Sequence, residues 1–563
     1  MNSKNLKNWN CHKVTLYFLL LFGIMSFEFL FCNSNFVREL IYNKLDLSLY
    51  VVSPARLVLY FIFFIICYFS KDKIIENRIL YEEDAKHKKS YKILSGIIIV
   101  WFALLVFLWK INILHIMTLG ILLMFLDYII LLYLFYGINF KINIMLVCLI
   151  SLIYSISTNT FQVLDEVSHV PTSYNIAHGN FSPNHIYFDP SLERINILSN
   201  YSSNEHLFIH YKPVKEDITN NGLYLYDTAS EFLHIPAAIG IIFSEKLNGT
   251  IMDTFYIGRI FNTLFFLGLV LLLLKEIRYN KNSFIAILTT PFLLLLAGTY
   301  SMDGLGFVLI SLFAVYIINI FKDKKIKQIN SKHLIVILLL MFLVSLYKGA
   351  SYLFVYLLLL LIINKIPKKY RIIMLIGFIL TLLLTYLVVY ASIDVNVGDT
   401  RGGNTSLIGQ LKFLFSSPVI FIKVYFLHLT NTFLNCQFYQ SMLNEMFFGR
   451  FARIFVILYI VYLIYIGIDN DTKLIKKEKL IYLLVTILLF GFTSTALYLS
   501  FTPVGETTIL GYQSRYVFPF LPFILLCMKN KYITVKKTKK HQDFNYMLVI
   551  LFNVGLFITS IVG

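Results

Sequence analysis

The sequence predicts an all-α protein that crosses a membrane many times. Of its 563 residues, 58% are hydrophobic and only 14% are charged, and the mean hydropathy is +0.73. A soluble domain carries about a quarter charged residues. The apolar residues also form blocks of about 20, the length that a helix needs to cross ~30 Å of hydrocarbon. Because these blocks lack the alternation of barrel strands, they indicate transmembrane helices.

The apolar blocks predict about fifteen transmembrane helices. We expect these helices near residues 14–32, 51–69, 93–109, 112–136, 143–158, 254–274, 283–299, 303–321, 333–347, 349–364, 372–391, 451–468, 480–500, 512–528 and 545–562. The narrowest division is Tyr347-Lys348-Gly349, between the ninth and tenth helices. If this break were absent, the two helices would merge and the sidedness of everything downstream would invert.

The distribution of basic residues predicts the orientation. The net charge of +18 would suit nucleic-acid binding, but no basic face with interleaved aromatic residues exists, so we expect no nucleic-acid partner. Most of the 49 lysines and arginines fall in short loops that are cytoplasmic if the N-terminus is inside. This is the positive-inside pattern of a multi-pass plasma-membrane protein.

Two long loops then lie outside, about 159–253 and about 392–450. The second contains an apolar block near 411–436 that is long enough for a sixteenth span. Spanning there would move the downstream lysine clusters to the outside, so we interpret the block as an interfacial helix. The expected organisation is N-terminal helices in 1–142, a core in 143–391 that includes the loop 159–253, an extracytoplasmic loop in 392–450 and C-terminal helices in 451–563.

The strongest candidate for chemistry is an acidic pair just beyond the fifth predicted helix. Asp165 and Glu166 are followed by His169, and such a group at the membrane edge can supply a general base. It can equally be a solvated loop start that anchors the helix end. Asp303, at the outer start of the eighth helix, can bind sugar hydroxyls or cap the helix.

Three cations fall near the same membrane face. Lys348 and Arg515 are expected at outer helix ends, and Arg259 in the outer half of the sixth helix. Cations at this depth can hold a lipid-linked phosphate through charge-assisted hydrogen bonds. The alternative is that each side chain extends to the interface without binding anything.

Other titratable residues suggest different chemistry. Glu28 and Asp127 lie within apolar blocks and can mark a proton path in a transporter, or can be paired to neighbouring helices. His206 and His210 have metal-ligand spacing only if that stretch is helical, which nothing indicates. The six cysteines lack metal spacing, and no glycine-rich phosphate loop or GxSxG motif occurs. We therefore expect no metal and no cofactor.

Five short stretches carry a resemblance to a known family. In chain order they are Leu164-Asp165-Glu166-Val167-Ser168-His169 with Tyr174 and Gly179, then Ile257-Gly258-Arg259, Met302-Asp303-Gly304, Tyr347-Lys348-Gly349 and Gly511-Tyr512-Gln513-Ser514-Arg515-Tyr516. With these, the chain resembles a bacterial family of uncharacterised polytopic membrane proteins related to the GT-C glycosyltransferases. The resemblance covers roughly 143–530.

The resemblance implies a GT-C-like glycosyltransferase of the bacterial cell membrane. Its donor would be a polyprenyl-phosphate-linked sugar, and its acceptor a cell-surface glycan or lipid outside the membrane. Asp165 would be the catalytic base, with Glu166 and His169 orienting the base or the acceptor. The roles implied for the remaining residues are lipid-phosphate binding for Arg515, Tyr516, Lys348 and Arg259, and substrate binding for Asp303 and Gln513.

Two other functions remain open on the sequence. A transporter or flippase of lipid-linked glycans would depend on Asp127 or Glu28 and would not need Asp165. A purely structural subunit would need none of these residues.

Overall fold

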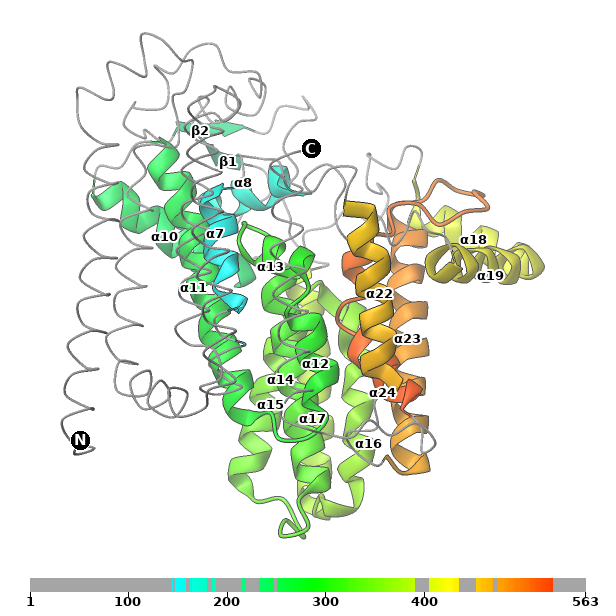
Figure 1. The fold of residues 1–563 in the computed structure, drawn as a ribbon. Coiled ribbons are helices and arrows are strands. Elements are labelled where there is room, and N and C mark those ends of the chain that lie inside the picture. Colours follow the sequence, from blue (N-terminus) through cyan, green and yellow to red (C-terminus); the bar gives the residue numbers. More distant parts are fainter. Residues whose placement is uncertain are drawn as a thin grey trace, which may run out of the picture. The chain divides into compact units, whose positions relative to one another are not determined.

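The computed structural model describes the chain between residues 144 and 529, with gaps. The described residues are 144, 147–157, 163, 165–179, 185–188, 214–217, 232–247, 251–389, 405–434, 452–468 and 474–529. They are helical apart from a two-stranded sheet in the first long loop, formed by β1 (His185–Phe188) and β2 (Val214–Asp217) (Figure 1). The predicted helices before residue 143 and after residue 530, together with Glu28, Asp127, His206 and His210, lie outside the described residues.

The chain divides into two compact units. The first comprises residues 1–164, 187–217 and 236–264, and the second comprises 165–186, 218–235 and 265–563.

In the first unit, two helices approach each other closely. The unit contains α7 (Ile150–Ser157), nearly all of α10 (Ile235–Lys246) and the first half of α11 (Ile251–Glu276). A side chain at Gly240 of α10 would place its first carbon 2.7 Å from the carbonyl oxygen of Ile257 on α11. Only glycine allows the two backbones to come so near. Ser244 and Thr254 hydrogen-bond between the same helices at 3.1 Å.

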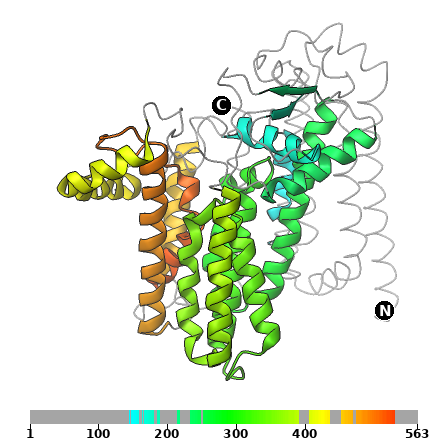
Figure 2. The ribbon, with the colours of Figure 1, turned by 180° about the vertical axis from the view of Figure 1, so that it is seen from behind.

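The second unit is a bundle of apolar helices with α14 at its centre (Figures 1 and 2). Almost every residue of α14 is buried. The bundle consists of α12 (Lys281–Leu288), α13 (Pro291–Ala297), α14 (Asp303–Lys322), α15 (Ser331–Ser345), η3 (Gly349–Leu358), α16 (Leu359–Ile362), η4 (Ile363–Lys365), α17 (Lys368–Val389), α22 (Ala452–Ile468), α23 (Lys476–Ser500) and α24 (Leu521–Met528).

The predicted break at Tyr347-Lys348-Gly349 is present. Lys348 adopts a left-handed conformation with φ of 47°, so α15 ends and the chain reverses into η3. The backbone N–H of Ile329, before α15, donates to the carbonyl oxygen of Lys365 at 2.9 Å. The two arms therefore form a hairpin that returns to the end of the bundle where it began.

Two predicted helices differ from the structure. The stretch 283–299 is not one helix, because α12 ends at Leu288 and Pro291 starts α13 after an extended Thr290. A proline forces the preceding residue out of the helical region and cannot donate the next helical hydrogen bond. The stretch 512–528 is a short 3₁₀ turn, η6 (Ser514–Tyr516), followed by α24, whose eight residues extend only about 12 Å.

By length and hydropathy, three described helices can cross a membrane. They are Thr254–Glu276, Asp303–Lys322 and Lys476–Ser500. The described residues thus confirm apolar helices of spanning length but do not decide the predicted total of about fifteen.

The predicted interfacial helix is a bent pair. α18 (Leu407–Ser416) and α19 (Pro418–Leu434) meet at 108°, and they would count as a fourth span only if taken together. Both views place the pair across one end of α23 (Figures 1 and 2). Tyr425 of α19 hydrogen-bonds Thr495 of α23 at 2.5 Å, which fixes the pair to the bundle. The interfacial interpretation stays a prediction, because a bent pair of this kind also fits a broken span or a re-entrant segment.

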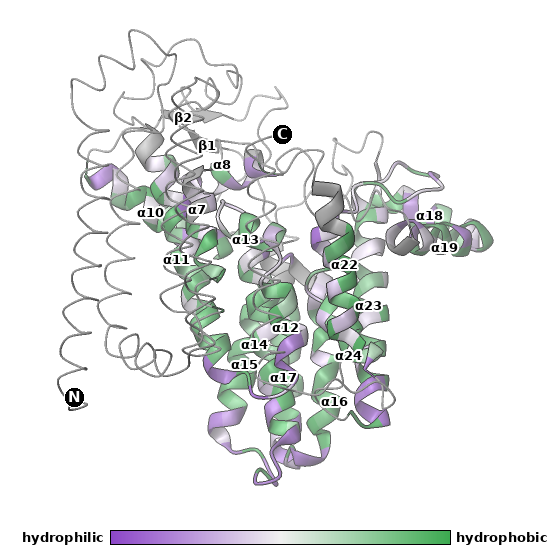
Figure 3. Cartoon of the chain, in the orientation of Figure 1, coloured by the Kyte–Doolittle hydropathy of each residue, from purple (hydrophilic) through white to green (hydrophobic). Residues whose placement is uncertain are grey.

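Basic residues gather at one end of the bundle, which we call the basic end and define by Lys322, Lys332, Lys365, Lys368 and Lys476. Lys322 pairs there with Glu478 at 2.7 Å. Figure 3 shows these hydrophilic ends and the hydrophobic middle of the helices.

α14 runs from Asp303 to this basic end at Lys322. Its 20 residues extend about 30 Å, which matches the thickness of a hydrocarbon layer. We therefore expect Asp303 and the basic end at opposite membrane faces.

This arrangement predicts which positions are accessible from outside the cell. In a background without the six native cysteines, Thr507→Cys, exposed beyond α23, should react with a membrane-impermeant maleimide on intact cells. Lys327→Cys, exposed at the basic end, should react only after the membrane is permeabilised. Labelling of both positions, or of Lys327→Cys alone, on intact cells would contradict the orientation.

Candidate functional site

A buried carboxylate joins three segments at the end of the bundle opposite the basic end. Asp303 begins α14 and is 2% exposed. Its Oδ1 accepts a hydrogen bond from the Tyr347 hydroxyl at 2.7 Å and lies 2.5 Å from Lys348 Nζ. Its Oδ2 lies 3.3 Å from Arg515 Nη1 and accepts from Ser301 Oγ at 3.3 Å. Both oxygens of Asp303 are therefore engaged by this chain's own side chains.

Lys348 reaches Asp303 because of the turn that it makes. Its left-handed backbone conformation is uncommon for a residue other than glycine and occurs often at functional sites. Its Nζ also lies 4.2 Å from the centre of the Tyr516 ring and 5.4 Å from that of Tyr347. Cations are attracted to aromatic faces at these distances. The ammonium is thus held between a carboxylate and two rings.

Tyr347 fits against α14 only because Gly306 has no side chain. A first side-chain carbon at Gly306 would collide with the Tyr347 ring. The ring also stacks on Tyr352, with centres 4.9 Å apart and planes at 23°. Tyr352 in turn donates to the backbone carbonyl of Tyr516 at 3.1 Å. These contacts connect the hairpin turn to the segment that carries Arg515.

Arg515 connects Asp303 to the first acidic residue of the predicted pair. It lies in η6, is 2% exposed and donates from Nη2 to Asp165 Oδ2. Asp165 is the N-cap of α8 (Glu166–Ala177) with φ of 61°, and its side chain is 31% exposed. The Nε of Arg515 has no hydrogen-bond acceptor among the described residues. One guanidinium therefore links a buried carboxylate to a partly exposed one and keeps an unused donor.

Glu166 and His169 are buried, at 1% and 4% exposure. Glu166 Oε1 accepts from the backbone N–H of Tyr300 at 3.4 Å, which ties α8 to the segment before α14. His169 Nδ1 lies 3.0 Å from Nε2 of His234, a buried histidine in the turn before α10. These contacts hold α8, and with it Asp165, in place.

Gln513 and His428 add polar atoms beside the aromatic residues of the site. Gln513 Oε1 and His428 Nε2 are buried and have no hydrogen-bond partner in the described part of the chain. The His428 ring, on α19, packs edge-on against Tyr512 with centres 4.6 Å apart. Tyr512 in turn contacts Tyr516 at 5.7 Å.

Arg259 belongs to the first unit, whereas the site residues described above belong to the second. Its guanidinium is buried and lies over the rings of Phe255, at 4.6 Å, and Tyr256, at 5.5 Å. Its role in phosphate binding remains a prediction from the sequence.

The structure thus brings together five predicted residues in one cluster. We call it the Asp303 cluster; its members are Asp165, Asp303, Lys348, Arg515 and Tyr516. Its two carboxylates balance its two cations. Among the described residues, no group of three or more His, Cys, Asp or Glu side chains is placed to hold a metal ion.

Sequence reasoning assigned no role to several residues around the cluster. Tyr347 and Gly306 give Asp303 its hydroxyl contact, His234 contacts His169, and His428 packs beside Tyr512. Tyr347 could have been suspected because it precedes Lys348 in a matching stretch. The contact between His428 and Tyr512 joins residues 84 positions apart in the sequence, and no local sequence pattern predicts it.

Residues 148–524 match the model of a family described as a predicted membrane protein, DUF2142. The chain belongs to this family. The matched region begins near α7, ends within α24 and includes every member of the Asp303 cluster. Membership establishes a multi-span membrane protein, and the family description names no activity. No curated protein and no solved structure matches the chain.

Loss of the buried carboxylate should destabilise the protein. Asp303→Ala would leave Lys348 and Arg515 short of a counter-ion, and breaking a buried ion pair costs about 3–5 kcal/mol. Thermal unfolding in detergent should show a large decrease in midpoint. Asp323→Asn is the control, because Asp323 lies at the basic end and its carboxylate caps the backbone of Lys325. Equal midpoints for the two variants would contradict a central role for Asp303.

The close approach of Tyr347 gives a second stability prediction. Gly306→Ala should push the Tyr347 ring away from Asp303, and overpacking of this kind costs about 1–3 kcal/mol. Gly491→Ala in α23 is a matched control, because its added carbon meets nothing within 4 Å. The control should unfold at or slightly above the wild-type temperature, since alanine favours helix. A Gly306→Ala protein as stable as the control would refute the packing.

Proposed function

We propose that this protein is a GT-C-like glycosyltransferase. It moves a sugar from a polyprenyl-phosphate donor to a glycan or lipid acceptor outside the membrane. The observation that carries the proposal is a partly exposed carboxylate, Asp165, paired with a buried guanidinium, Arg515, at the membrane face opposite the basic end. A base and a phosphate-binding cation side by side are what transfer from a lipid phosphate requires.

Exposure distinguishes the three carboxylates near the site. Asp165 is 31% exposed, whereas Asp303 and Glu166 are 2% and 1% exposed. Only Asp165 of these three is accessible to the hydroxyl of an acceptor. This supports Asp165 as the general base that the resemblance implies.

The reaction follows from this pairing. The acceptor oxygen attacks the anomeric carbon of the donor sugar and forms the new C–O bond, while its proton passes to Asp165. The bond between the anomeric carbon and the phosphate oxygen breaks, and its electron pair leaves with the polyprenyl phosphate. Arg515 and Lys348 stabilise the negative charge that develops on the phosphate.

Arg515 is the side chain that Asp165 and the donor phosphate would share. It is ion-paired to Asp165. The donor phosphate competes for the guanidinium, using the Nε that has no acceptor in the described residues, and so releases the carboxylate for proton transfer. A planar guanidinium suits this exchange because it binds carboxylates and phosphates in the same bidentate geometry.

The contacts of Asp303 favour a positioning role over direct sugar binding. Both of its oxygens are engaged, by Tyr347 and Lys348 on one side and by Arg515 on the other. Asp303 keeps the two cations at a fixed separation, and pre-organised charges of this kind need no rearrangement when phosphate charge develops. Gln513 and His428 each have a buried polar atom without a partner in the described residues, and both are candidates for sugar hydroxyl contacts.

The decisive test replaces the Asp165 carboxylate with an amide of the same shape, which cannot take up a proton. Asp165→Asn should leave the protein in the membrane and lower sugar transfer by about 10²–10⁴-fold, the contribution of a general base. Arg515→Lys should also lower transfer, because a lysine lacks the planar fork of donors with which the guanidinium reaches both Asp165 and Asp303. The measurement is mass spectrometry of cell-surface glycans from cells with wild-type protein, each variant or no protein.

Glu506→Gln is the matched control, since Glu506 is an exposed carboxylate beyond the same end of α23. It should leave the glycans unchanged. Normal glycans from the Asp165→Asn protein would refute the proposed enzyme. If instead Asp127→Asn or Glu28→Gln abolished the modification while Asp165→Asn did not, the protein would be a transporter or flippase of lipid-linked glycans.

A further inference from the structure

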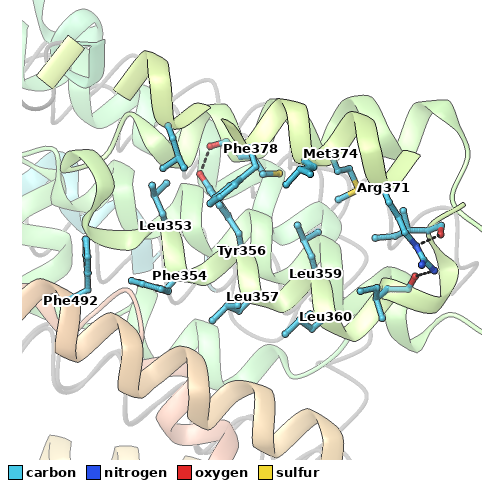
Figure 4. Close-up of a pocket in the computed structure, with 15 residues that line it drawn as sticks. Leu353, Phe354, Tyr356, Leu357, Leu359, Leu360, Arg371, Met374, Phe378 and Phe492 are labelled. Atoms are coloured by element: carbon cyan, nitrogen blue, oxygen red, sulfur yellow. Dashed lines mark hydrogen bonds between the residues drawn. The ribbon is translucent and has the colours of Figure 1, made fainter. Parts of the chain in front are cut away.

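An apolar groove runs along the second unit, on the side formed by α15, η3–α16, α17 and α23 (Figure 4). Its volume is about 630 Å³. Leu353 and Phe492 lie at one end of the groove, Leu357 and Leu360 along its floor, and Arg371 at the other end. Apart from Arg371 and the hydroxyl of Tyr356, which donates to the Met341 carbonyl at 2.5 Å, the lining is hydrocarbon or thioether.

The groove opens to the surroundings of the bundle. Among its lining residues, Leu375 is 59% exposed and Leu360 and Phe492 are each 38% exposed. The groove borders α23, which is long and apolar enough to cross a membrane, so we infer that this opening faces hydrocarbon. A groove of this shape and chemistry accepts a single hydrocarbon chain.

The charged end of the groove indicates the headgroup of the lipid whose hydrocarbon chain fills the groove. Arg371 donates from Nε to the Ile366 carbonyl at 3.2 Å and from Nη2 to the Ile363 carbonyl at 3.1 Å, so its guanidinium is fixed at the groove end. These two bonds use two of its five donors. Lys368 and Lys369, in the first turn of α17, are exposed beside it.

This end of the groove is the basic end. Among the described residues there, lysines and arginines outnumber the carboxylates, and the carbonyls at the end of α14 are already occupied by Lys365 Nζ, at 2.6 to 3.1 Å. Lys368, Lys369 and Arg371 are therefore available to a ligand from outside the chain. Basic residues at a membrane surface attract anionic lipid headgroups by about fivefold per residue.

We propose that the groove is a binding site for an anionic phospholipid of the cytoplasmic leaflet. One acyl chain lies along α16 and α17, and the phosphate binds Arg371 together with Lys368 and Lys369. The headgroup then lies at the far end of the bundle from the Asp303 cluster. This site is independent of the proposed transferase activity.

The test measures which lipids stay bound to the purified full-length protein. Native mass spectrometry would follow binding of phosphatidylglycerol and phosphatidylcholine with identical acyl chains, added in mild detergent. We expect phosphatidylglycerol to bind at least tenfold better and to raise the unfolding temperature more than phosphatidylcholine does. Arg371→Gln should lower this preference about fivefold, and Arg371→Lys should restore part of it.

A second variant tests the binding of the lipid's acyl chain rather than that of its headgroup. Leu357→Trp should fill the groove and lower the binding of both lipids. Two controls match these changes: Lys327→Gln removes an exposed cation at the basic end away from the groove, and Leu339→Trp enlarges an exposed apolar side chain of α15 that does not line it. Both controls should bind lipid as the wild type does.

Three results would overturn the proposal. Equal affinity for the two phospholipids would remove the charge argument. An Arg371→Gln protein that behaves like Lys327→Gln would remove Arg371 from the site. A polyprenyl lipid that copurifies with the wild type and is displaced by Leu357→Trp, while phosphatidylglycerol is not, would assign the groove to the tail of the proposed donor.

Discussion

The shared carboxylate of Asp303 is the interaction on which the rest of the site depends. It contacts Tyr347, Lys348 and Arg515, and Arg515 extends the network to Asp165. These residues come from the start of α14, the hairpin turn, η6 and the start of α8. Because buried charges are costly unless each has partners, the four segments hold one another in place.

Buried ion pairs are seldom the most stable way to fill a helix bundle, since apolar residues of similar volume often stabilise more. A balanced set of two acids and two bases at a helix-bundle end is therefore better explained by function than by stability. Within that set, burial separates the two carboxylates: Asp303 is enclosed between the two cations, whereas Asp165 is partly exposed. Aromatic rings around Lys348 fix its ammonium without neutralising it.

Helix length connects this site to the membrane. α14 separates the Asp303 cluster from the basic end by about one hydrocarbon thickness. The hairpin at Lys348 returns the chain to the basic end, because Ile329 before the first arm is hydrogen-bonded to Lys365 at the end of the second. The acid pair, the hairpin turn and Arg515 consequently share one face, while the lysine-rich turns share the other.

The sequence by itself determined these helices, since α14, α15, α17, α22 and α23 lie within a few residues of the predicted ranges. Hydropathy is a local property, and each spanning helix satisfies its own backbone. Pairing is not local: Arg515 and Asp165 are 350 residues apart, and no pattern near either one identifies the other. Only the tertiary structure decided that Asp303 is enclosed while Asp165 is partly open, because solvent exposure depends on which segments pack above a residue.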